Sequence, residues 1–389
     1  MKAPTLILLL TLHASLTHAA TFGGLGDLPG GAFNSAANAV SADGSVIVGA
    51  SQSAAGYEGF RWTLESGIVG LGDLPGGSFS SPASRVSADG LTIVGSSVSA
   101  SGPEAFRWTS ATGITGLGDL PGGSFQSGAL GVSADGSTIV GYGVTTAGFG
   151  EIGQRAVRWV SGGSPASLAS TDYSYANAVS SDGLTIVGRL NTGDNQAFRW
   201  TLATGMVGLG YLPGGYSYSD ALSISANGSV IVGQAFHSVS SESEAFSWTE
   251  ATGLVGLGDL PGGTFYSYAW DASSDGSLIV GTGRSATGDE AFLWDSAHGM
   301  RNLRDVLISD YGVTNLTGWT LSAARGISAD GQTIVGDGIN PSGQTEAWRV
   351  TGVPEPSSAL LLLSGSLLLL LRRSLRTHYT SVFFILTIV

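Results

Sequence analysis

Cysteine is absent from the sequence, and lysine occurs once, as Lys2. The absence of cysteine excludes disulfides, thiol nucleophiles and thiolate metal ligands, but it does not choose a compartment, because a large closed β-sheet can be stable without disulfides. Charged residues make up only 12% of the 389 residues. Between Thr21 and Gly352, 28 acidic residues oppose 12 arginines, which gives a formal charge of −16. Because phosphate binding needs a basic surface, this balance argues against nucleic acid as a partner.

Histidine is also scarce. Three of the five histidines lie beyond the N-terminal segment, and these three, His237, His298 and His378, stand in unrelated settings. This argues against a histidine-built metal site or acid–base pair. The sequence also offers no nucleophile with a neighbouring base. We therefore predict no catalytic residues, no metal ligands and no cofactor.

Glycine, by contrast, is abundant, and much of it belongs to a repeat. An Asp-Gly or Asn-Gly pair recurs every 45 to 55 residues, beginning at Asp43, Asp89, Asp135, Asp182, Asn227, Asp275 and Asp330. Each pair is followed by Ile-Val-Gly and then by a segment that ends in tryptophan, such as residues 104–108. A third element, GLGDLPGG or a close variant, begins at Gly24, Gly70, Gly116, Gly208 and Gly256. A fixed period of this length indicates a repeat architecture.

Each repeat contains four short apolar runs separated by turn residues, which we interpret as strands. In the second repeat they cover residues 83–88, 91–97, 104–109 and 114–120. The Asp-Gly pair between the first two runs predicts a hairpin with a type I′ turn, in which both central residues have positive φ. The Ile-Val pair does not alternate with polar residues, so the second strand should be buried on both faces.

Seven such repeats predict an all-β fold, a seven-bladed β-propeller of four-stranded blades of about 46 residues. Stacking of blades around an axis would bury both faces of each sheet. A parallel β-helix is the alternative, because it also repeats and is also rich in glycine. Its rungs are usually shorter than 46 residues.

The two ends of the repeat region favour the closed ring. Residues 21–28 match the fourth strand of a repeat that lacks its first three, whereas the last repeat stops at its third strand, residues 346–350. An N-terminal strand that completes the last blade would leave no free sheet edge in the ring. We therefore expect these two segments to pair, with Gly26 close to Arg349.

Residues 1–20 have the layout of a secretory signal peptide. Lys2 precedes an apolar run over residues 6–12, and Ala19 and Ala20 follow as small residues suited to cleavage. A permanent N-terminal anchor is the alternative, but the apolar run is too short to span a bilayer.

The C-terminal region, residues 353–376, resembles the PEP-CTERM sorting signal of Gram-negative bacteria. The motif Val353-Pro354-Glu355-Pro356 precedes an apolar run over residues 359–371, and arginines follow at Arg372, Arg373 and Arg376. The resemblance implies recognition by an exosortase, a sorting protease of the inner membrane. The arginines would remain cytoplasmic and serve as the anchor of a short transmembrane segment. Residues 377–389 form an additional apolar tail that such signals normally lack, and an uncleaved C-terminal anchor is the alternative.

The repeat resembles the HAF extracellular repeat family, named after a His-Ala-Phe sequence at the start of the third strand. Here the corresponding positions read Glu104-Ala105-Phe106, Gln196-Ala197-Phe198, Glu244-Ala245-Phe246 and Glu290-Ala291-Phe292, so another residue replaces the histidine. The resemblance covers residues 21–352 and implies an extracellular repeat protein without an assigned reaction.

Ligand-binding candidates come from the GLGDLPGG element. Its aspartate is followed after six residues by a phenylalanine, in the pairs Asp27 and Phe33, Asp73 and Phe79, Asp119 and Phe125, and Asp259 and Phe265. A carboxylate beside an aromatic ring suits the hydroxyls and the apolar face of a sugar, and the carboxylates could also bind calcium. The alternative is that each aspartate caps its Pro-Gly-Gly turn by accepting backbone N–H groups.

Two further features have structural and functional interpretations. Phe106 and Trp108 lie two residues apart on one face of the third strand, as do their counterparts, and we expect them to pack between blades. Between Asp275 and Asp330 the repeat is longer by an insertion in residues 301–318. Such a loop is a common place for function, but it could instead cap the blade where the ring closes.

These observations predict an exported, non-catalytic repeat protein of the bacterial cell surface or extracellular matrix, secreted after transient anchoring in the inner membrane. Its expected partners are an exosortase and an extracellular polysaccharide or another surface. A propeller-type glycan hydrolase or lyase is the alternative. Enzymes place unlike residues at one site of a symmetric ring, and the apparent uniformity of these repeats favours the binding protein.

Overall fold

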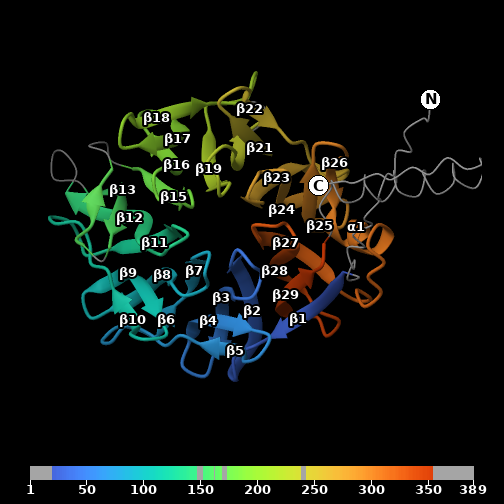
Figure 1. Ribbon diagram of the computed structural model, residues 1–389, viewed down its shortest axis with the longest axis horizontal. Coiled ribbons are helices and arrows are strands. Elements are labelled where there is room, and N and C mark those ends of the chain that lie inside the picture. Colours follow the sequence, from blue (N-terminus) through green and yellow to red (C-terminus); the bar gives the residue numbers. More distant parts are fainter. Residues whose placement is uncertain (1–19, 147–151, 162, 169–172, 238–241, 354–389) are drawn as a thin grey trace, which may run out of the picture. The chain divides into compact units, whose positions relative to one another are not determined.

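The structure is a computed structural model that describes residues 20–146, 152–161, 163–168, 173–237 and 242–353. Within these residues, seven four-stranded antiparallel sheets are arranged as blades around a common centre (Figure 1). This confirms the predicted all-β, seven-bladed propeller. The blades are numbered here in chain order.

Blade 1 contains strands β2 (Gly30–Val40), β3 (Ile47–Ser53), β4 (Tyr57–Thr63) and β5 (Gly67–Gly70). Blade 2 contains β7 (Ala83–Val86), β8 (Ile93–Ser99), β9 (Gly102–Thr109) and β10 (Gly113–Gly116). Blade 3 contains β11 (Ser127–Val132), β12 (Thr138–Thr146), β13 (Ile152–Val160) and β14 (Ala166–Ser167). The short β6 (Ser80–Ser81) pairs in parallel with β4 and so links blade 2 to blade 1.

Blades 4 and 5 contain β15 (Tyr175–Val179), β16 (Ile186–Asn191), β17 (Asn195–Thr201) and β18 (Gly205–Gly210); β19 (Ser219–Ile224), β20 (Ile231–Phe236), β21 (Ser243–Thr249) and β22 (Gly253–Gly256). Blades 6 and 7 contain β23 (Gly262–Ala272), β24 (Leu278–Ser285), β25 (Gly288–Asp295) and β26 (Gly299–Asn302); β27 (Thr320–Ile327), β28 (Thr333–Ile339), β29 (Thr345–Thr351) and β1 (Thr21–Gly26).

The first strand of each blade lies nearest the centre, and later strands lie progressively farther out (Figure 1). The Pro-Gly-Gly segments lead from the outer strand of one blade to the inner strand of the next, so they gather at one face, which we call the loop face. The Asp-Gly turns connect the opposite ends of the inner strands to the second strands and define the turn face.

The Asp-Gly hairpins are present, but the predicted type I′ turn is wrong. Gly44 has φ of 74°, whereas Asp43 is not among the described non-glycine residues with positive φ. The Asp43 carboxylate instead accepts hydrogen bonds from the Ser41 hydroxyl at 2.7 Å and the Ser45 backbone N–H at 3.0 Å. The aspartate thus stabilises the turn through its side chain, and only the glycine needs the left-handed conformation.

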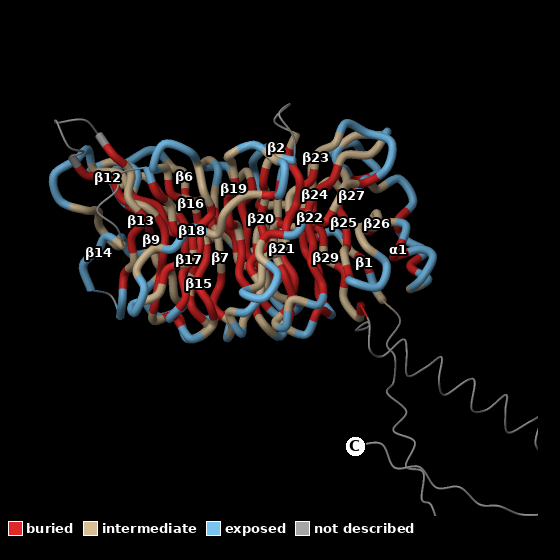
Figure 2. The backbone as a smooth tube through the Cα atoms, turned by 90° about the horizontal axis from the view of Figure 1, so that it is seen from above, coloured by how far each residue is buried: buried red, intermediate tan, exposed pale blue. Residues whose placement is uncertain are grey.

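The core lies between adjacent blades, in a buried layer between the exposed loop and turn faces (Figure 2). Ile93 packs toward blade 1, and its neighbour Val94 packs toward blade 3. Both are fully buried, which confirms the prediction that second strands are covered on both faces. The third-strand rings also belong to this core, because Phe60, Phe106, Phe198, Phe246 and Phe292 are completely buried.

The glycine of each Ile-Val-Gly sequence is required by close contact with the inner strand. A Cβ atom on Gly49 would lie 1.9 Å from the carbonyl oxygen of Ala36, and one on Gly188 would lie 1.9 Å from that of Tyr175. Any larger residue would force the two strands apart.

A buried serine on the inner strands joins neighbouring blades. The Ser127 hydroxyl accepts the backbone N–H of Ala105 at 3.0 Å and donates to the Gly118 carbonyl at 2.7 Å, so it bridges the last two strands of the preceding blade. Equivalent serines accept the matching third-strand N–H groups at Ser35, Ser81, Ser174, Ser219 and Ser267. Sequence analysis missed these serines, although they recur at the spacing of the Asp-Gly pairs.

A glutamate near the start of several third strands has a structural role. Glu104 Oε1 accepts the backbone N–H of Gly118 at 3.0 Å, next to the outer strand of the same blade. Glu58, Glu244 and Glu346 bind the equivalent glycine N–H groups of their sheets. This glutamate therefore caps the turn after the fourth strand.

The N-terminal strand closes the ring, as predicted. Strand β1 pairs antiparallel with β29 and completes blade 7. The register differs from the expected one, because Gly26 lies opposite Ala347 and Gly23 lies opposite Arg349. The β-bulge between Gly24 and Gly26 contributes to this offset.

The insertion in residues 301–318 packs against this closure. It contains the helix α1 (Leu303–Ser309), which Asn302 caps, and it buries Leu303, Val306 and Leu307 in the blade 6 and blade 7 core. Beyond it, Trp319 meets the ring of Phe22 edge-on, with centroids 5.0 Å apart. The structure thus gives the insertion a capping role at the closing blade.

The terminal segments of the sequence prediction lie mostly outside the described residues. These include the signal peptide up to residue 19, Pro354, Glu355, Pro356, Arg372, Arg373, Arg376 and the tail over residues 377–389. Val353 is described, and it is buried in the propeller core, 1% exposed. In the described ranges, no helix has the length and apolar character needed to cross a membrane.

Candidate functional site

The aspartates predicted to bind a ligand are hydrogen-bonded to their own loops or to the second strand of the following blade. Asp27 accepts the Ser51 hydroxyl at 2.5 Å, and Asp73 accepts that of Ser97. Asp119 accepts the backbone N–H groups of Leu120, Gln126 and Val144, at 2.7 to 3.0 Å. Asp259 likewise accepts those of Tyr266 and Arg284. The backbone bonds of Asp119 and Asp259 agree with the turn-capping interpretation, whereas Asp27 and Asp73 accept serine hydroxyls from second strands.

Burial raises the pKa of Asp119 and of Asp259, and the backbone N–H groups partly offset this effect. The four phenylalanines, Phe33, Phe79, Phe125 and Phe265, are half-buried near these loops. Phe265 stacks on His237, with centroids 4.6 Å apart and planes 21° from parallel. The predicted aspartates and phenylalanines therefore lie on separate Pro-Gly-Gly loops around the ring.

The channel contains a set of side chains that the sequence pattern did not reveal. In all seven blades the pairing of the first two strands shifts by one residue at the same place, which marks a β-bulge. A bulge changes the direction of a side chain and often lies beside a functional site. The residues at the bulge are Asn38, Ser84, Leu130, Asn177, Leu222, Trp270 and Arg325. The repeats are therefore not uniform at the axis, although their scaffold residues are.

The next residue along each inner strand is small in five blades and charged in two. Ala39, Gly131, Ala178, Ser223 and Gly326 occupy this position in blades 1, 3, 4, 5 and 7. Arg85 occupies it in blade 2, and Asp271 in blade 6. Since the other five blades place only small groups here, the two charged side chains have room inside the channel.

Aromatic and arginine side chains form two groups, one over blades 3 to 5 and one over blades 6 and 7, which together we call the belt. Tyr142 packs edge-on against Tyr175, with centroids 5.5 Å apart, and the Arg189 guanidinium lies 5.2 Å from the Tyr175 ring. Arg189 also donates to the Tyr218 hydroxyl at 3.0 Å. In blade 6, Tyr268 stacks on Trp270 with planes 10° from parallel. Tyr142 and Arg189 each directly follow an Ile-Val-Gly sequence, whereas Tyr268 lies on an inner strand.

The belt continues into blade 7 and has acidic side chains beside its arginines. The Arg325 guanidinium lies 5.7 Å from the Trp270 ring and forms an ion pair with Asp337. Arg189 forms an ion pair with Asp220 at 3.3 Å, and Asn177 donates to the other Asp220 oxygen at 2.8 Å. Rings, guanidinium groups and carboxylates therefore alternate over several blades on one face.

Asp220 is a carboxyl group of the belt whose pKa is strongly raised. Its residue is only 7% exposed, and this burial raises its pKa to about 6, against the opposing effects of Arg189 and Asn177. The carboxyl group therefore changes charge close to neutral pH.

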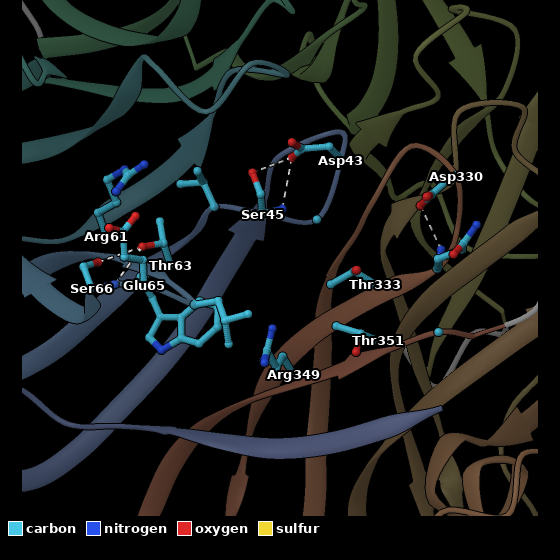
Figure 3. Close-up of a pocket in the computed structure, with 16 residues that line it drawn as sticks. Asp43, Ser45, Arg61, Thr63, Glu65, Ser66, Asp330, Thr333, Arg349 and Thr351 are labelled. Atoms are coloured by element: carbon cyan, nitrogen blue, oxygen red, sulfur yellow. Dashed lines mark hydrogen bonds between the residues drawn. The ribbon is translucent and has the colours of Figure 1, made fainter. Parts of the chain in front are cut away.

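A pocket lies elsewhere, on the turn face between blades 1 and 7 (Figure 3). It has a volume of about 660 Å³. Its polar groups are engaged in local contacts: Asp43 and Asp330 bind their own turns, and Thr63 bonds to Ser66. Arg349 stacks on Trp62 at 4.4 Å, as Arg158 does on Trp200 between blades 3 and 4. This groove therefore has the packing of a blade junction.

The histidines also have local partners. His298 Nδ1 lies 2.9 Å from the Asp295 carboxylate, which also binds Arg301, and His237 Nδ1 lies 2.5 Å from Glu244. Across the described parts of the chain, no group of three or more histidine and acidic side chains is arranged to hold a metal ion.

No family model matches the sequence, and the search of curated proteins likewise gives no match. Solved propellers are similar in fold. Oligogalacturonate lyase from Vibrio parahaemolyticus superposes with a TM-score of 0.55 at 12% identity, over 91% of this chain and 99% of that one. The propeller domain of the Trilobed protease from Pyrococcus furiosus gives 0.50 at 13% identity, over 70% and 84%.

TolB from Acinetobacter baumannii gives a TM-score of 0.46 at 13% identity, over 69% of this chain, and the match spans 62% of the TolB chain. At such identities the likeness concerns the fold alone.

Proposed function

We propose that this chain is an exported, non-catalytic propeller of the bacterial cell surface that binds a glycan at the loop-face mouth of its channel. The observation that carries the proposal is the gathering of tyrosine and tryptophan rings with arginines and carboxylates on the first two strands of several blades. Tyrosine and tryptophan rings offer flat apolar surfaces for a sugar ring. The arginines, carboxylates and amides beside them supply the few directed hydrogen bonds that fix a ligand's orientation.

Export and sorting belong to the same proposal and rest on the sequence. The signal peptide and the PEP-CTERM-like segment would deliver the propeller across the inner membrane, where an exosortase would release it. An excess of acidic residues on the exported region is compatible with binding sugars and unfavourable for binding nucleic acid.

The test is a glycan-binding screen with the purified protein, followed by titration calorimetry on the best oligosaccharide. Replacing Trp270 or Tyr175 with alanine should weaken binding at least tenfold, in the range found for central aromatic residues of interfaces. The matched control is Phe33→Ala, which removes a half-buried ring from a Pro-Gly-Gly loop and should leave the affinity within twofold.

The double variant Asp73→Ala with Asp119→Ala separates the channel from the loops. If the loop carboxylates only cap their turns, this variant should unfold at a lower temperature and keep its affinity for the glycan. Loss of binding without loss of stability would place the ligand on the loops and contradict the channel site.

A glycan hydrolase or lyase is the second candidate, and Asp220 is the observation that favours it. A buried carboxyl group that titrates near neutral pH can act as a general acid or base, and one of the structurally similar propellers is an oligogalacturonate lyase. Prolonged incubation with bound oligosaccharides, analysed by mass spectrometry, tests this candidate. Shortened products that disappear in Asp220→Asn would establish an enzyme.

A further inference from the structure

Arg85 lies on the inner strand of blade 2, and most of its hydrogen-bond donors have no partner among the described residues. Its Nη1 atom donates to the Ser84 carbonyl at 3.0 Å and to the Asn38 carbonyl of blade 1 at 3.4 Å. The described residues offer no hydrogen bond to its Nε and Nη2 atoms, and none of their carboxylates lies within ion-pair distance of it. A guanidinium group has five N–H donors in a rigid plane, so most of this group's donors are available.

The electrostatic surroundings of Arg85 extend across the ring. Burial lowers its pKa, Asp271 of blade 6 opposes that effect, and Arg325 of blade 7 adds to it. Two guanidinium groups and one carboxylate therefore influence one another inside the channel. Repulsion between Arg85 and Arg325 is partly offset by the Asp271 carboxylate and by the ion pair of Arg325 with Asp337.

Asp271 supplies a compensating negative charge near Arg85, but its oxygens accept their hydrogen bonds from other neighbours. Oδ1 accepts the Ser223 hydroxyl at 2.7 Å, and Oδ2 accepts the Ile327 backbone N–H at 3.1 Å. Asp220 and Asp337 are likewise paired, with Arg189 and Arg325. Arg85 thus lies below an aromatic belt with donors that none of the described acidic groups uses.

We infer that the channel accepts the carboxylate of a uronic acid, with Arg85 as the main contact and Arg325 as the second cation. This rests on the proposed function, because the belt must hold the sugar ring above the carboxylate. A planar carboxylate matches the planar donor pair of a guanidinium group and can bind it with two parallel hydrogen bonds. The net negative charge of the domain disfavours long polyanions, so the ligand is a short oligosaccharide with a terminal uronate.

The experiment compares two probes by titration calorimetry with the full-length protein. One probe is a trisaccharide that ends in glucuronic acid, and the other is the same trisaccharide with that carboxylate reduced to an alcohol. The wild type should bind the acidic probe at least tenfold more tightly. Arg85→Gln should remove this preference, because it deletes the charge and the fork of donors, and should change the affinity for the reduced probe less than twofold.

Arg85→Lys and Arg199→Gln are the companion variants. Arg85→Lys keeps the charge without the fork, so it should retain part of the preference even if Arg85→Gln folds poorly. Arg199 lies on the third strand of blade 4, away from the inner strands, and Arg199→Gln should behave as the wild type. Equal binding of both probes by the wild type, or an unchanged preference in Arg85→Gln, would overturn the inference while leaving a neutral glycan site. If neither probe binds and the glycan screen is also negative, the proposed function itself is overturned.

Discussion

At the residue scale, the buried serines show how one hydroxyl can join three strands. Ser127 is fully buried and satisfies both the Ala105 N–H and the Gly118 carbonyl. A buried donor that loses its partner carries the full desolvation penalty. These serines therefore contribute to blade-to-blade cohesion in a protein that has no disulfides.

Replacing Ser127 with alanine should lower the free energy of unfolding by about 1–3 kcal/mol. The Ala105 N–H would then lie in the core without an acceptor. Denaturant unfolding followed by tryptophan fluorescence measures the change. Ser110→Ala is the control, since this serine is exposed in a turn, and its unfolding free energy should stay within about 0.5 kcal/mol of the wild type. Equal stability of the two variants would show that the buried bonds contribute little.

Asp220 makes stability depend on pH. Its pKa is about 6 in the folded protein and about 3.9 in an unfolded chain, so the folded state holds the proton more tightly. The contribution of this group is therefore fully present below about pH 4 and is lost as the pH rises through about 6. Asp220→Asn should lack this loss, so its stability relative to the wild type should increase by up to about 3 kcal/mol between pH 4 and pH 7.

Urea unfolding at several pH values tests the Asp220 prediction. Asp135→Asn is a suitable control, because the Ser133 hydroxyl, followed by backbone and side-chain bonds from Ser137, lowers the Asp135 pKa to about 2. That carboxyl group contributes stability that is present above about pH 4 and lost only as the pH falls through about 2. The difference between this variant and the wild type should therefore stay constant from pH 5 to pH 8. A constant difference for Asp220→Asn as well would refute the elevated pKa.

At the element scale, ring closure depends on a strand that is more than 300 residues away from its partner in sequence. Strand β1 covers the edge of β29, and the Thr21 and Thr351 hydroxyls lie 2.7 Å apart across this pair. Unpaired edges of this kind promote aggregation. The insertion with α1 then buries apolar side chains against the same blade.

Cysteines at positions 21 and 351 should form a disulfide under mild oxidation and raise the unfolding temperature. The side-chain oxygens that they replace are already close together, and a disulfide needs Cβ atoms about 4 Å apart. Non-reducing electrophoresis and thermal unfolding report the bond and its effect. In the control pair, cysteines replace Thr21 and Thr345. Thr21 lies opposite Thr351, at the other end of β29 from Thr345, so this pair should remain reduced. A disulfide in the control, or none in the test pair, would contradict the closed ring.

At the scale of the whole molecule, the propeller ends at a residue that the sequence assigned to the sorting motif. Val353 is packed in the blade 7 core, and its N–H donates to the Gln332 carbonyl at 3.1 Å. Loss of a buried valine would leave a cavity beside the ring closure. The propeller therefore extends through Val353, the first residue of the predicted sorting motif.

We predict that the protein recovered outside the cell lacks residues 1–19 or 1–20 and ends after Val353, within or just beyond the Pro-Glu-Pro motif. Intact-mass spectrometry of the secreted form measures both ends. A strain without exosortase activity is the control, and there the C-terminal segment should be retained in the membrane fraction. A full-length C-terminus in the secreted fraction would exclude the sorting-signal interpretation and leave an anchored protein.

The sequence by itself determined the number of blades, the order of strands and the closure of the ring. The number of blades and the order of strands follow from local rules that act in every repeat: the Asp-Gly pair forms a turn, and the Ile-Val-Gly strand is buried between two neighbouring blades. The closure follows because the incomplete first and last repeats complement each other. The sequence did not determine the type of turn or the exact pairing of β1. Both depend on side-chain bonds and a bulge that hydrophobic periodicity does not record.

Only the tertiary structure decided which residues share the candidate site. Arg85 and Asp271 occupy the same position of the repeat in blades 2 and 6, and Arg325 occupies the position before it in blade 7. Only the closed ring brings the three side chains near one another. The aspartates of the Pro-Gly-Gly loops attracted attention because they repeat, yet their bonds go to their own loops and to second strands. In a ring of equivalent blades, repeated residues build the scaffold. Residues that differ from blade to blade meet at the axis, because the inner strands bring one position from every repeat into a single channel.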